Sequence, residues 1–323
     1  MRKIAILDDY QRVALDMADW EPVTRQCTVK IFDRPLGTME QAAAALRDFE
    51  IVCAMRERLP FPRALFERLP NLRLLITTGM HNRSLDLDAA AEHGVLVCHT
   101  RGGGTEHSTT ELTWALILAA ARHVPLEDRG MRAGGWQTTV GMTLHGKTLG
   151  VLGLGRLGSR AAAIGRAFGM EIIAWSPNLT AERAAAGGAR LVGKDELFAT
   201  SDVLTIHMVL SERSRGLVGA KELALLPAHA ILVNTSRGPI VDEAALIEAL
   251  REQRIGGAGL DVFDREPLPA DHPLRTLDNV VLTPHLGYVS QESYSVFFQD
   301  IVENILAYLA GSPIRVLGGK AHG

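Results

Sequence analysis

A glycine-rich segment at residues 153–158, near the middle of the chain, is the feature that most restricts what this sequence can fold into. It follows the apolar residues 149–152 and precedes a helix-like stretch. In this setting Gly153 allows a sharp turn, Gly155 lets the backbone approach a pyrophosphate, and Gly158 lets helix and strand pack closely. The N-terminus of the helix would face the phosphates with unpaired N–H groups. The segment predicts dinucleotide binding rather than an ordinary tight turn, and its mid-chain position predicts a cofactor domain inserted within another domain.

The size and composition of the chain are those of a soluble protein with two domains. Its 323 residues exceed the length at which one hydrophobic core usually stops growing. Hydrophobic residues make up 47%, charged residues 22%, and the formal net charge is -3, which gives no reason to expect a nucleic-acid partner. A small-molecule substrate is therefore expected.

The lack of a recognisable export signal and the small number of cysteines both lead us to expect a cytoplasmic protein. The apolar stretch that begins the chain ends by residue 7 and is too short for the core of an export signal. The longest apolar run, residues 112–121, has about half the length that a membrane span needs, so we expect a buried helix and no membrane association. Cys27, Cys53 and Cys98 are few and widely spaced, which predicts reduced thiols rather than a disulfide framework or a zinc site.

The first hundred residues alternate between short apolar runs and helical stretches. Strands are expected at 4–7, 28–32, 51–55, 72–77 and 95–98, and their almost uniformly apolar character is typical of strands covered on both faces. Helices are expected at 38–46, where Thr38 and Gln41 form a capping-box pattern, and at 85–93, which ends at Gly94. The alanine-rich residues 42–45 and 184–186 are interpreted as helix surface. This alternation predicts a parallel sheet with right-handed crossovers.

A second series of strands begins at Thr148. Strands are expected from there to 152 and at 171–175, 203–207, 230–234, 257–261 and 280–283, with helices at 157–168 and 242–253. Long helices at 105–122 and 291–310 would connect the two series. The tail contains a short return segment at 313–317 and a frayed end. The predicted fold is α/β with two doubly wound parallel-sheet domains: a Rossmann dinucleotide-binding domain (104–290) inserted in a discontinuous flavodoxin-like substrate domain (1–103 and 291–323).

Three polar segments of the second series each follow the end of a predicted strand and contain Arg237, Glu266 and His285. The carboxyl ends of parallel strands form the ligand crevice of such sheets, so the three side chains could converge there. Arg237 would hold a substrate carboxylate and polarise a carbonyl, and His285 would donate a proton to the oxygen as hydride arrives. Glu266 would fix the imidazole tautomer and favour its protonated form. The set predicts reversible reduction of a keto acid with a nicotinamide cofactor.

On these segments the chain resembles the D-isomer-specific 2-hydroxyacid dehydrogenases, a family that includes phosphoglycerate, glycerate and D-lactate dehydrogenases, and the resemblance runs over essentially the whole length. It implies the roles just given to the arginine, the glutamate and the histidine, and homodimers joined through the cofactor domain. It implies that the segment after Thr77 supplies backbone N–H groups to the substrate carboxylate. The cofactor contacts that it implies are Arg156, Leu157, Thr78, Thr235, Ser236, Asp261, His285 and Gly287, and the substrate contacts are Gly79, Met80 and His81.

Each candidate also has a purely structural interpretation. Arg237 could be a turn arginine, Glu266 a solvated loop acid and His285 a capped turn histidine, but together, at successive strand ends, they favour catalysis. His207 also ends a strand, where a structural hydrogen bond to the backbone is the better interpretation. Arg56 and Arg58 either meet an anionic substrate group, which would be consistent with a phosphorylated substrate, or are solvated loop charges. Four further histidines (His81, His93, His99 and His107) are scattered without metal-site spacing, so no metal is expected.

The tip of the second cofactor-domain strand departs from the usual dinucleotide pattern. An acid normally stands there, bonds the ribose hydroxyls and repels a 2′-phosphate, whereas this chain has Ser176. No arginine sits immediately beside this serine to attract the phosphate. The cofactor is therefore expected to be NAD(H) or NADP(H): the resemblance implies NAD, and the missing acid predicts that NADP is accepted or even favoured.

The leading hypothesis is a cytoplasmic NAD(P)-dependent D-2-hydroxyacid dehydrogenase that closes over a small 2-keto or 2-hydroxy acid and excludes water. One alternative is a nucleotide-gated protein-interaction module on the same fold, like the corepressor relatives of this family, because fold alone does not set function. A second alternative, formate oxidation, is disfavoured by Glu266, since a glutamine is usual at that position in the formate branch.

Overall fold

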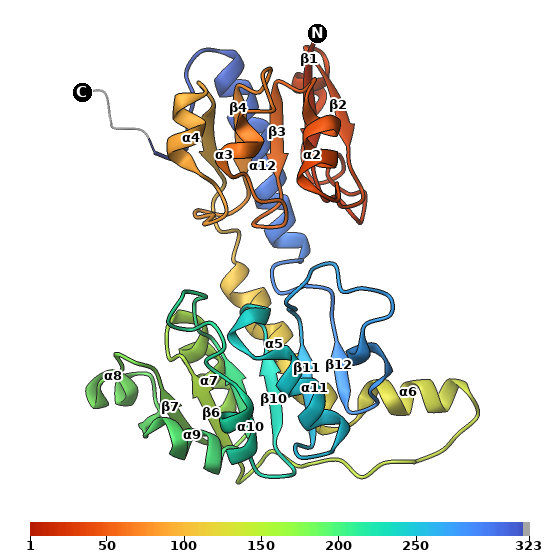
Figure 1. The fold of residues 1–323 in the computed structure, drawn as a ribbon, viewed down its shortest axis with the longest axis vertical. Coiled ribbons are helices and arrows are strands. Elements are labelled where there is room, and N and C mark those ends of the chain that lie inside the picture. The colour runs from red at the N-terminus through yellow and green to blue at the C-terminus, as the bar shows by residue number, and fades with distance from the viewer. Residues whose placement is uncertain (319–323) are drawn as a thin grey trace. The chain divides into compact units, whose positions relative to one another are not determined.

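The computed structural model describes residues 1–318 of the 323-residue chain, so the frayed end expected after the return segment lies outside the described residues. The chain divides into two compact units, drawn in Figure 1. The first unit combines Met1–Thr105 with the chain from Ser290 onward, and the second unit is Glu106–Val289. None of the helices among the described residues is long and apolar enough to cross a membrane.

The first unit contains a five-stranded parallel sheet with the order β2-β1-β3-β4-β5. This is the flavodoxin-like strand order, which agrees with the predicted fold. β3 and β4 are buried along their whole length, which explains their continuous apolar sequence. The strands are β1 (Arg2–Ile6), β2 (Cys27–Ile31), β3 (Ile51–Ala54), β4 (Leu74–Thr77) and β5 (Leu96–His99).

Three of the five described helices of the first unit begin at a capping side chain, which is Thr38, Asp86 or Ser290. Thr38 Oγ1 accepts from Gln41 N–H and Gln41 Oε1 accepts from Thr38 N–H, so the expected capping box is confirmed. Ala42 and Ala43 of that helix are buried, and the surface interpretation was wrong for these two, because they face the core. The helices are α1 (Glu21–Thr24), α2 (Met39–Leu46), α3 (Arg63–Phe66), α4 (Leu87–Glu92) and α12 (Gln291–Leu309).

The C-terminal return segment is present and pairs with the edge strand β5. His99 N–H donates to Arg315 O at 2.9 Å and Leu317 N–H donates to Val97 O at 2.8 Å. Cys98 and Val316 form an antiparallel bridge between them. The described end of the chain therefore covers the β5 edge of the sheet.

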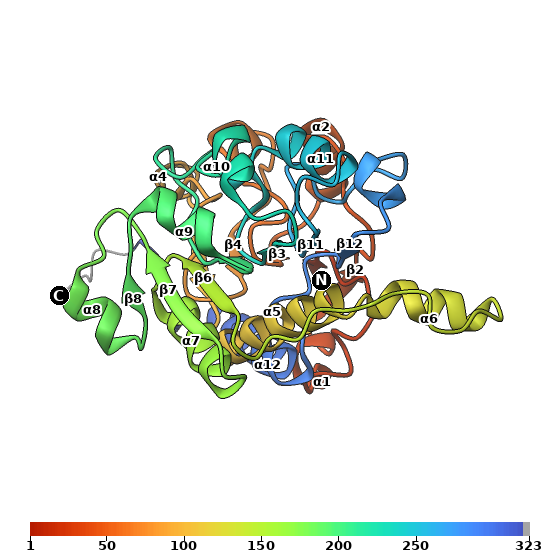
Figure 2. The same cartoon turned by 90° about the horizontal axis from the view of Figure 1, so that it is seen from below.

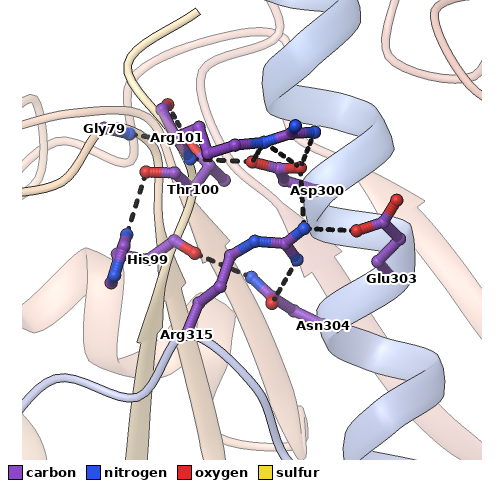
Figure 3. A network of polar contacts seen from close by, with 8 residues as sticks. All are labelled: Gly79, His99, Thr100, Arg101, Asp300, Glu303, Asn304 and Arg315. Carbon is purple, nitrogen blue, oxygen red and sulfur yellow. Dashed lines mark hydrogen bonds and ion pairs between the residues drawn. The ribbon is translucent and has the colours of Figure 1, made fainter.

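A buried carboxylate ties α12 to the end of β5 (Figure 3). Asp300 is fully buried and accepts hydrogen bonds from Arg101 N–H and from the Arg101 guanidinium, both at 2.7 Å. Arg315 lies 3.1 Å from the same carboxylate and donates to Asn304, which in turn donates to His99 O. A buried carboxylate is costly unless it is paired and hydrogen-bonded, and Asp300 meets both conditions.

The second unit contains a seven-stranded parallel sheet with the order β12-β11-β10-β9-β6-β7-β8. Numbered from β6, this is the Rossmann order 3-2-1-4-5-6 with one further strand at the edge. Apolar clusters on its two faces are built by α5 and α7 on one face and by α9, α10 and α11 on the other. The strands are β6 (Thr148–Leu152), β7 (Glu171–Trp175), β8 (Arg190–Leu191), β9 (Val203–Ile206), β10 (Ile231–Asn234), β11 (Gly257–Leu260) and β12 (Val280–Leu282).

The sequence predicted α5, α7, α11 and the helix at 184–186 (α8) in the second unit, but it did not predict α6, α9 or α10. α6 has no buried residue, and Figures 1 and 2 show it reaching away from the sheet of its own unit. Of the expected surface alanines at 184–186, Ala184 is instead fully buried in the core. The helices are α5 (Thr105–Ala121), α6 (Val124–Arg132), α7 (Arg156–Ala167), α8 (Ala181–Ala186), α9 (Lys194–Thr200), α10 (Ala220–Leu225) and α11 (Glu243–Arg251), with 3-10 turns η1 (Gly238–Ile240) and η2 (Pro273–Thr276).

Candidate active site

The polar segments of the second unit leave the sheet at one common edge. Asn234, Leu260 and Leu282 are partners across neighbouring parallel strands, so the residues that follow them emerge side by side. The chain runs outward from β6 through β7 to β8 and then returns to β9 on the other side of β6. A reversal of this kind at the carboxyl ends of the strands is where open α/β sheets bind ligands.

Two of the three glycines after β6, Gly153 and Gly158, are required by their surroundings, and the third, Gly155, faces open space. Gly153 has a φ of +101°, and a Cβ there would lie 2.7 Å from His207 O. A Cβ on Gly158 would lie 2.2 Å from Gly153 O, so helix α7 could not approach the strand with any other residue. A Cβ on Gly155 would meet nothing within 4 Å, which leaves open space in front of the first turn of α7.

The start of α7 fits the phosphates of a dinucleotide. Gly155 is the N-cap and has no side chain that could accept from the first N–H groups of the helix. Arg156 and Leu157 form the first turn that follows, and Arg156 is exposed. Unpaired N–H groups, the positive end of the helix dipole and an open approach together form an anion site.

Arg237 lies in a tightly fixed turn after β10. Asn234 Nδ2 donates to Arg237 O at 3.0 Å, and Arg237 Nη1 donates to Ser236 O at 2.7 Å. The next residue, Gly238, packs so closely on the backbone of Phe263 that a Cβ would lie 2.1 Å from the Phe263 carbonyl carbon. This contact places the arginine turn directly against the segment that contains Glu266.

Glu266 connects two strand ends. Its Oε2 lies 2.6 Å from His285 Nδ1, and its Oε1 accepts from Phe263 N–H at 3.0 Å. The Tyr288 ring packs edge-on against the imidazole at a centroid distance of 5.7 Å. Because the carboxylate accepts from Nδ1, the arrangement leaves Nε2 as the atom that can exchange a proton with a substrate.

The turn that contains His285 is held by Asp261. This fully buried carboxylate accepts from the Thr283 hydroxyl at 2.6 Å, from Leu286 N–H at 2.7 Å and from Gly287 N–H at 2.9 Å. Burial raises the pKa of Asp261, and the three hydrogen bonds oppose that rise. His285 itself has a φ of +56°, a left-handed conformation that these contacts stabilise.

Helix α5 supplies positioning contacts that the sequence analysis missed. The hydroxyls of Ser108 and Thr109 donate to Gly287 O at 2.9 and 2.8 Å. The Thr113 hydroxyl lies 2.9 Å from the Thr235 hydroxyl. The available signal was a row of hydroxyl residues in the polar first half of a helix whose second half is apolar. These contacts fix the backbone carbonyl of Gly287 and the side chain of Thr235, two of the expected cofactor contacts.

The hydrogen bond of the His207 side chain differs from the backbone contact that the sequence analysis expected. Its imidazole Nε2 lies 3.0 Å from the Thr205 hydroxyl rather than on a backbone group, because Thr205 is two residues earlier on the same strand and faces the same way. Its Nδ1 is buried and has no hydrogen-bond partner among the described residues. Burial lowers the pKa of His207 to about 4, so the ring is neutral near pH 7.

The neutral His207 should make the stability of the second unit depend on pH. An unfolded histidine with a pKa near 6.5 binds a proton that His207 with a pKa of about 4 does not, so folding stability falls as pH drops from 6.5 to 4. The full contribution is about 3 kcal/mol. Urea unfolding at several pH values should show a weaker pH dependence for His207→Gln than for the parent. His145→Gln, which changes an exposed histidine of the same unit, is the control, and equal slopes for parent and His207→Gln would contradict the assignment.

The first unit holds the remaining candidates at the carboxyl edge of its own sheet. Arg56, with a φ of +53°, follows β3, and its N–H donates to the buried Thr78 hydroxyl at 2.9 Å. Gly79 N–H donates to Thr100 Oγ1 at 2.8 Å, which connects this loop to the network of Figure 3. Met80 and His81 are exposed. The expected carboxylate donor Gly79 therefore already has a partner within its unit.

Arg58 lies beside a second pair of polar residues in the first unit. Its guanidinium stacks over the Tyr10 ring at 4.7 Å, and the Tyr10 hydroxyl donates to Asp8 at 3.0 Å. Burial raises the pKa of Asp8 and, with the Asp8 charge, that of Tyr10 to about 12. Arg58 is thus a structural partner of Tyr10 and Asp8, whereas Arg56 lies at the loop of Thr78. No cluster that could hold a metal ion occurs among residues 1–318.

The geometry of the second unit supports one kind of chemistry. An imidazole with an oriented free edge, a carboxylate behind it and a guanidinium on the adjacent strand end can protonate an oxygen and hold an anion. A glycine-lined helix N-terminus at the same edge can hold a dinucleotide. Proton exchange beside a hydride carrier is the reaction class that these groups fit.

Known proteins are similar to this chain in both sequence and fold. A family model described as "D-isomer specific 2-hydroxyacid dehydrogenase, NAD binding domain" matches residues 114–287. A glyoxylate reductase of Aeropyrum pernix is 43% identical over 256 residues, which cover 76% of each chain. A solved structure of a phosphoglycerate oxidoreductase from Vibrio cholerae superposes with a TM-score of 0.89 at 36% identity, over 96% of this chain and all of that one.

Some of the similar proteins are considerably longer. A D-3-phosphoglycerate dehydrogenase of Archaeoglobus fulgidus is 38% identical over 263 residues, which cover 81% of this chain but only 50% of that protein. This chain thus spans about half the length of that relative.

Proposed function

Since this chain belongs to the D-isomer-specific 2-hydroxyacid dehydrogenases, we propose that Arg237, Glu266 and His285 carry out its reaction. The enzyme is an oxidoreductase that transfers hydride between NAD(H) or NADP(H) and a pair formed by a 2-keto acid and a D-2-hydroxy acid. The observation that carries the assignment of roles is the 2.6 Å contact between His285 Nδ1 and Glu266 Oε2 at adjacent strand ends of a dinucleotide fold.

His285 is the acid and base of the proposed reaction. In reduction, Nε2 donates a proton to the substrate carbonyl oxygen, and in oxidation it removes the hydroxyl proton. Glu266 stabilises the imidazolium that forms in the oxidation direction and keeps Nε2 directed at the substrate. Arg237 binds the substrate carboxylate through paired N–H donors and polarises the carbonyl. The nicotinamide supplies or accepts the hydride.

The cofactor is proposed to lie along the edge that Gly153, Gly155 and Gly158 leave open. The backbone of residues 156–157 meets the pyrophosphate, and the turns at Thr235–Ser236 and His285–Gly287 line the nicotinamide end. Asp261 and the hydroxyls of α5 act through the backbone that they hold.

The substrate is proposed to be a small 2-keto acid, held also by the first unit as substrate domain. Because Thr78 N–H and Gly79 N–H already donate within the unit, the backbone of Met80 and His81 and the arginine at position 56 supply donors for its carboxylate or for a second anionic group. Names of similar proteins include glyoxylate reductase and phosphoglycerate dehydrogenase, which favours short and phosphorylated keto acids as candidates.

A substrate panel tests this function. Purified protein is mixed with NADH or NADPH and with glyoxylate, hydroxypyruvate, phosphohydroxypyruvate, pyruvate or bulkier keto acids, and loss of reduced-cofactor absorbance is recorded. We expect turnover with at least one short keto acid. Absence of turnover across the panel, together with nucleotide-dependent capture of a protein partner, would favour an interaction module instead.

The assembly is proposed to be a homodimer joined through the second unit. Helix α6 has no buried residue, and the chain after it exposes Trp136 and Val140 by 73% and 94%. A second copy of the chain would cover this projecting surface and bury the two exposed apolar side chains. Sedimentation equilibrium should then give twice the chain mass of 35.0 kDa, and a monomer would refute the proposal.

A cytoplasmic location, without nucleic-acid or membrane partners, is proposed on composition and on three buried free thiols.

A further inference from the structure

The turn after β7 lies next to the glycine segment. Trp175 pairs with Leu152 at the ends of β7 and β6, and Gly153 N–H donates to Trp175 O at 2.9 Å. The chain then makes a turn in which Leu179 N–H donates to Ser176 O at 3.1 Å. Proline at the second position of this turn restricts its backbone. Ser176 therefore occupies a fixed place immediately beside the proposed pyrophosphate site.

Arg183 reaches this turn from helix α8. Its Nη1 donates to Asn178 O at 3.1 Å, and its own N–H donates to Thr180 Oγ1 at 3.3 Å. The next residue, Ala184, is fully buried and anchors the helix in the core of the second unit. The sequence suggested no arginine beside Ser176, but the short helix folds back and brings one there from seven positions further along.

The charge around this turn is positive. Within 1–318, Arg183 forms no ion pair with a carboxylate, and it is exposed. Between residues 172 and 194 the only acid is Glu182. Hydrogen bonds from its own backbone N–H and from Thr180 hold the pKa of Glu182 below its usual range, so this carboxylate is engaged at the start of α8.

A dinucleotide bound at the glycine segment places its adenosine ribose at the tip of the second strand. An acid at that tip accepts from the 2′-hydroxyl and repels a 2′-phosphate, whereas a guanidinium binds the phosphate through paired N–H donors. Here the tip has a hydroxyl, and a guanidinium lies against the same turn. We propose that Ser176 and Arg183 form a binding site for the 2′-phosphate of NADP(H), which makes NADP(H) the preferred cofactor of the enzyme.

This inference rests on the proposed cofactor site and is tested by binding rather than by turnover. Dissociation constants of the full-length protein are measured by calorimetry for NADPH, NADH, 2′,5′-ADP and 5′-AMP. Parent protein should bind NADPH and 2′,5′-ADP more tightly than NADH and 5′-AMP. Arg183→Gln should weaken binding of the two 2′-phosphorylated ligands about tenfold, the loss of a charge-assisted contact, and leave the other two within about twofold.

Two further variants make the result specific to this site. Arg183→Lys retains the charge without the planar fork and should fall between parent and Arg183→Gln. Arg190→Gln removes an exposed arginine of the neighbouring strand that pairs with Glu196, and should change no constant. Ser176→Asp should reverse the preference, because a carboxylate repels the phosphate and bonds the ribose hydroxyls.

The outcomes separate this site from the cofactor assignment itself. Parent protein that binds NADH tenfold or more tightly than NADPH overturns the inference, and so does an Arg183→Gln variant that weakens all four ligands equally. Inorganic phosphate that competes with 5′-AMP as well as with 2′,5′-ADP would indicate a general anion site and also overturn it. Failure to bind any of the dinucleotides would instead refute the placement of the cofactor at the glycine segment.

Discussion

Replacing His285 with alanine is expected to lower the turnover number for keto-acid reduction by about a hundred- to ten-thousandfold, the usual contribution of a positioned acid–base group. Binding of reduced cofactor should change by less than about threefold, since the glycine segment and α7 are untouched. Stopped-flow or steady-state absorbance gives the first quantity, and cofactor fluorescence gives the second.

The backbone at position 285 calls for a second variant. His285 has a φ of +56°, which alanine tolerates poorly and asparagine tolerates better. His285→Asn should therefore retain the parent's thermal stability and still lose turnover to the same extent. Turnover within tenfold of the parent in either variant would remove this residue from the role of acid and base.

Replacing Arg237 with glutamine is expected to reduce kcat/KM for the keto acid by about a hundred- to a thousandfold, the effect of losing a charged donor that acts on both the ground state and the transition state. Arg237→Lys should recover little of this loss, because a single ammonium cannot reproduce the paired geometry of a guanidinium. Steady-state kinetics with a saturating cofactor measure both variants.

A matched control separates substrate binding from stability. Arg251→Gln removes an exposed arginine from α11, in the same unit, and should leave kcat/KM unchanged. If Arg237→Gln bound the cofactor less well but handled bound substrate normally, the arginine would belong to the cofactor site, and its proposed role toward the carboxylate would be wrong.

Local patterns in the sequence predicted the fold well. The expected strands at 51–55 and 171–175 are present as β3 and β7, with β3 buried and β7 buried at its centre, and the Thr38–Gln41 pair forms a capping box. Such features depend on a few neighbouring residues and on the period of the strand or helix, so they can be read without coordinates. Parallel order follows from the alternation of strands and helices, which leaves few topologies.

What the sequence did not predict depends on contacts between distant positions. Ser108 and Thr109 bind Gly287 O across separations of 179 and 178 residues; the row of hydroxyls marks the donors, but no local pattern indicates their distant acceptor. Arg183 reaches the Ser176 turn only because α8 is short and reverses the chain. Helix α6 was missed because its nine residues include a proline, a glycine and four charged residues, and none of them is buried, so the segment does not read as a helix packed against a core.

The pairing of Asp300 with Arg101 and Arg315 has a consequence for how the protein matures during translation. The carboxylate and its first partner are 199 residues apart, and its second partner lies near the end of the chain. The second unit is continuous and can complete its core while the ribosome is still adding the last segment. The first unit cannot complete its core until α12 and the segment that pairs with β5 have been synthesised. Until then its unfinished sheet is the part of the nascent chain that most needs protection by chaperones against aggregation.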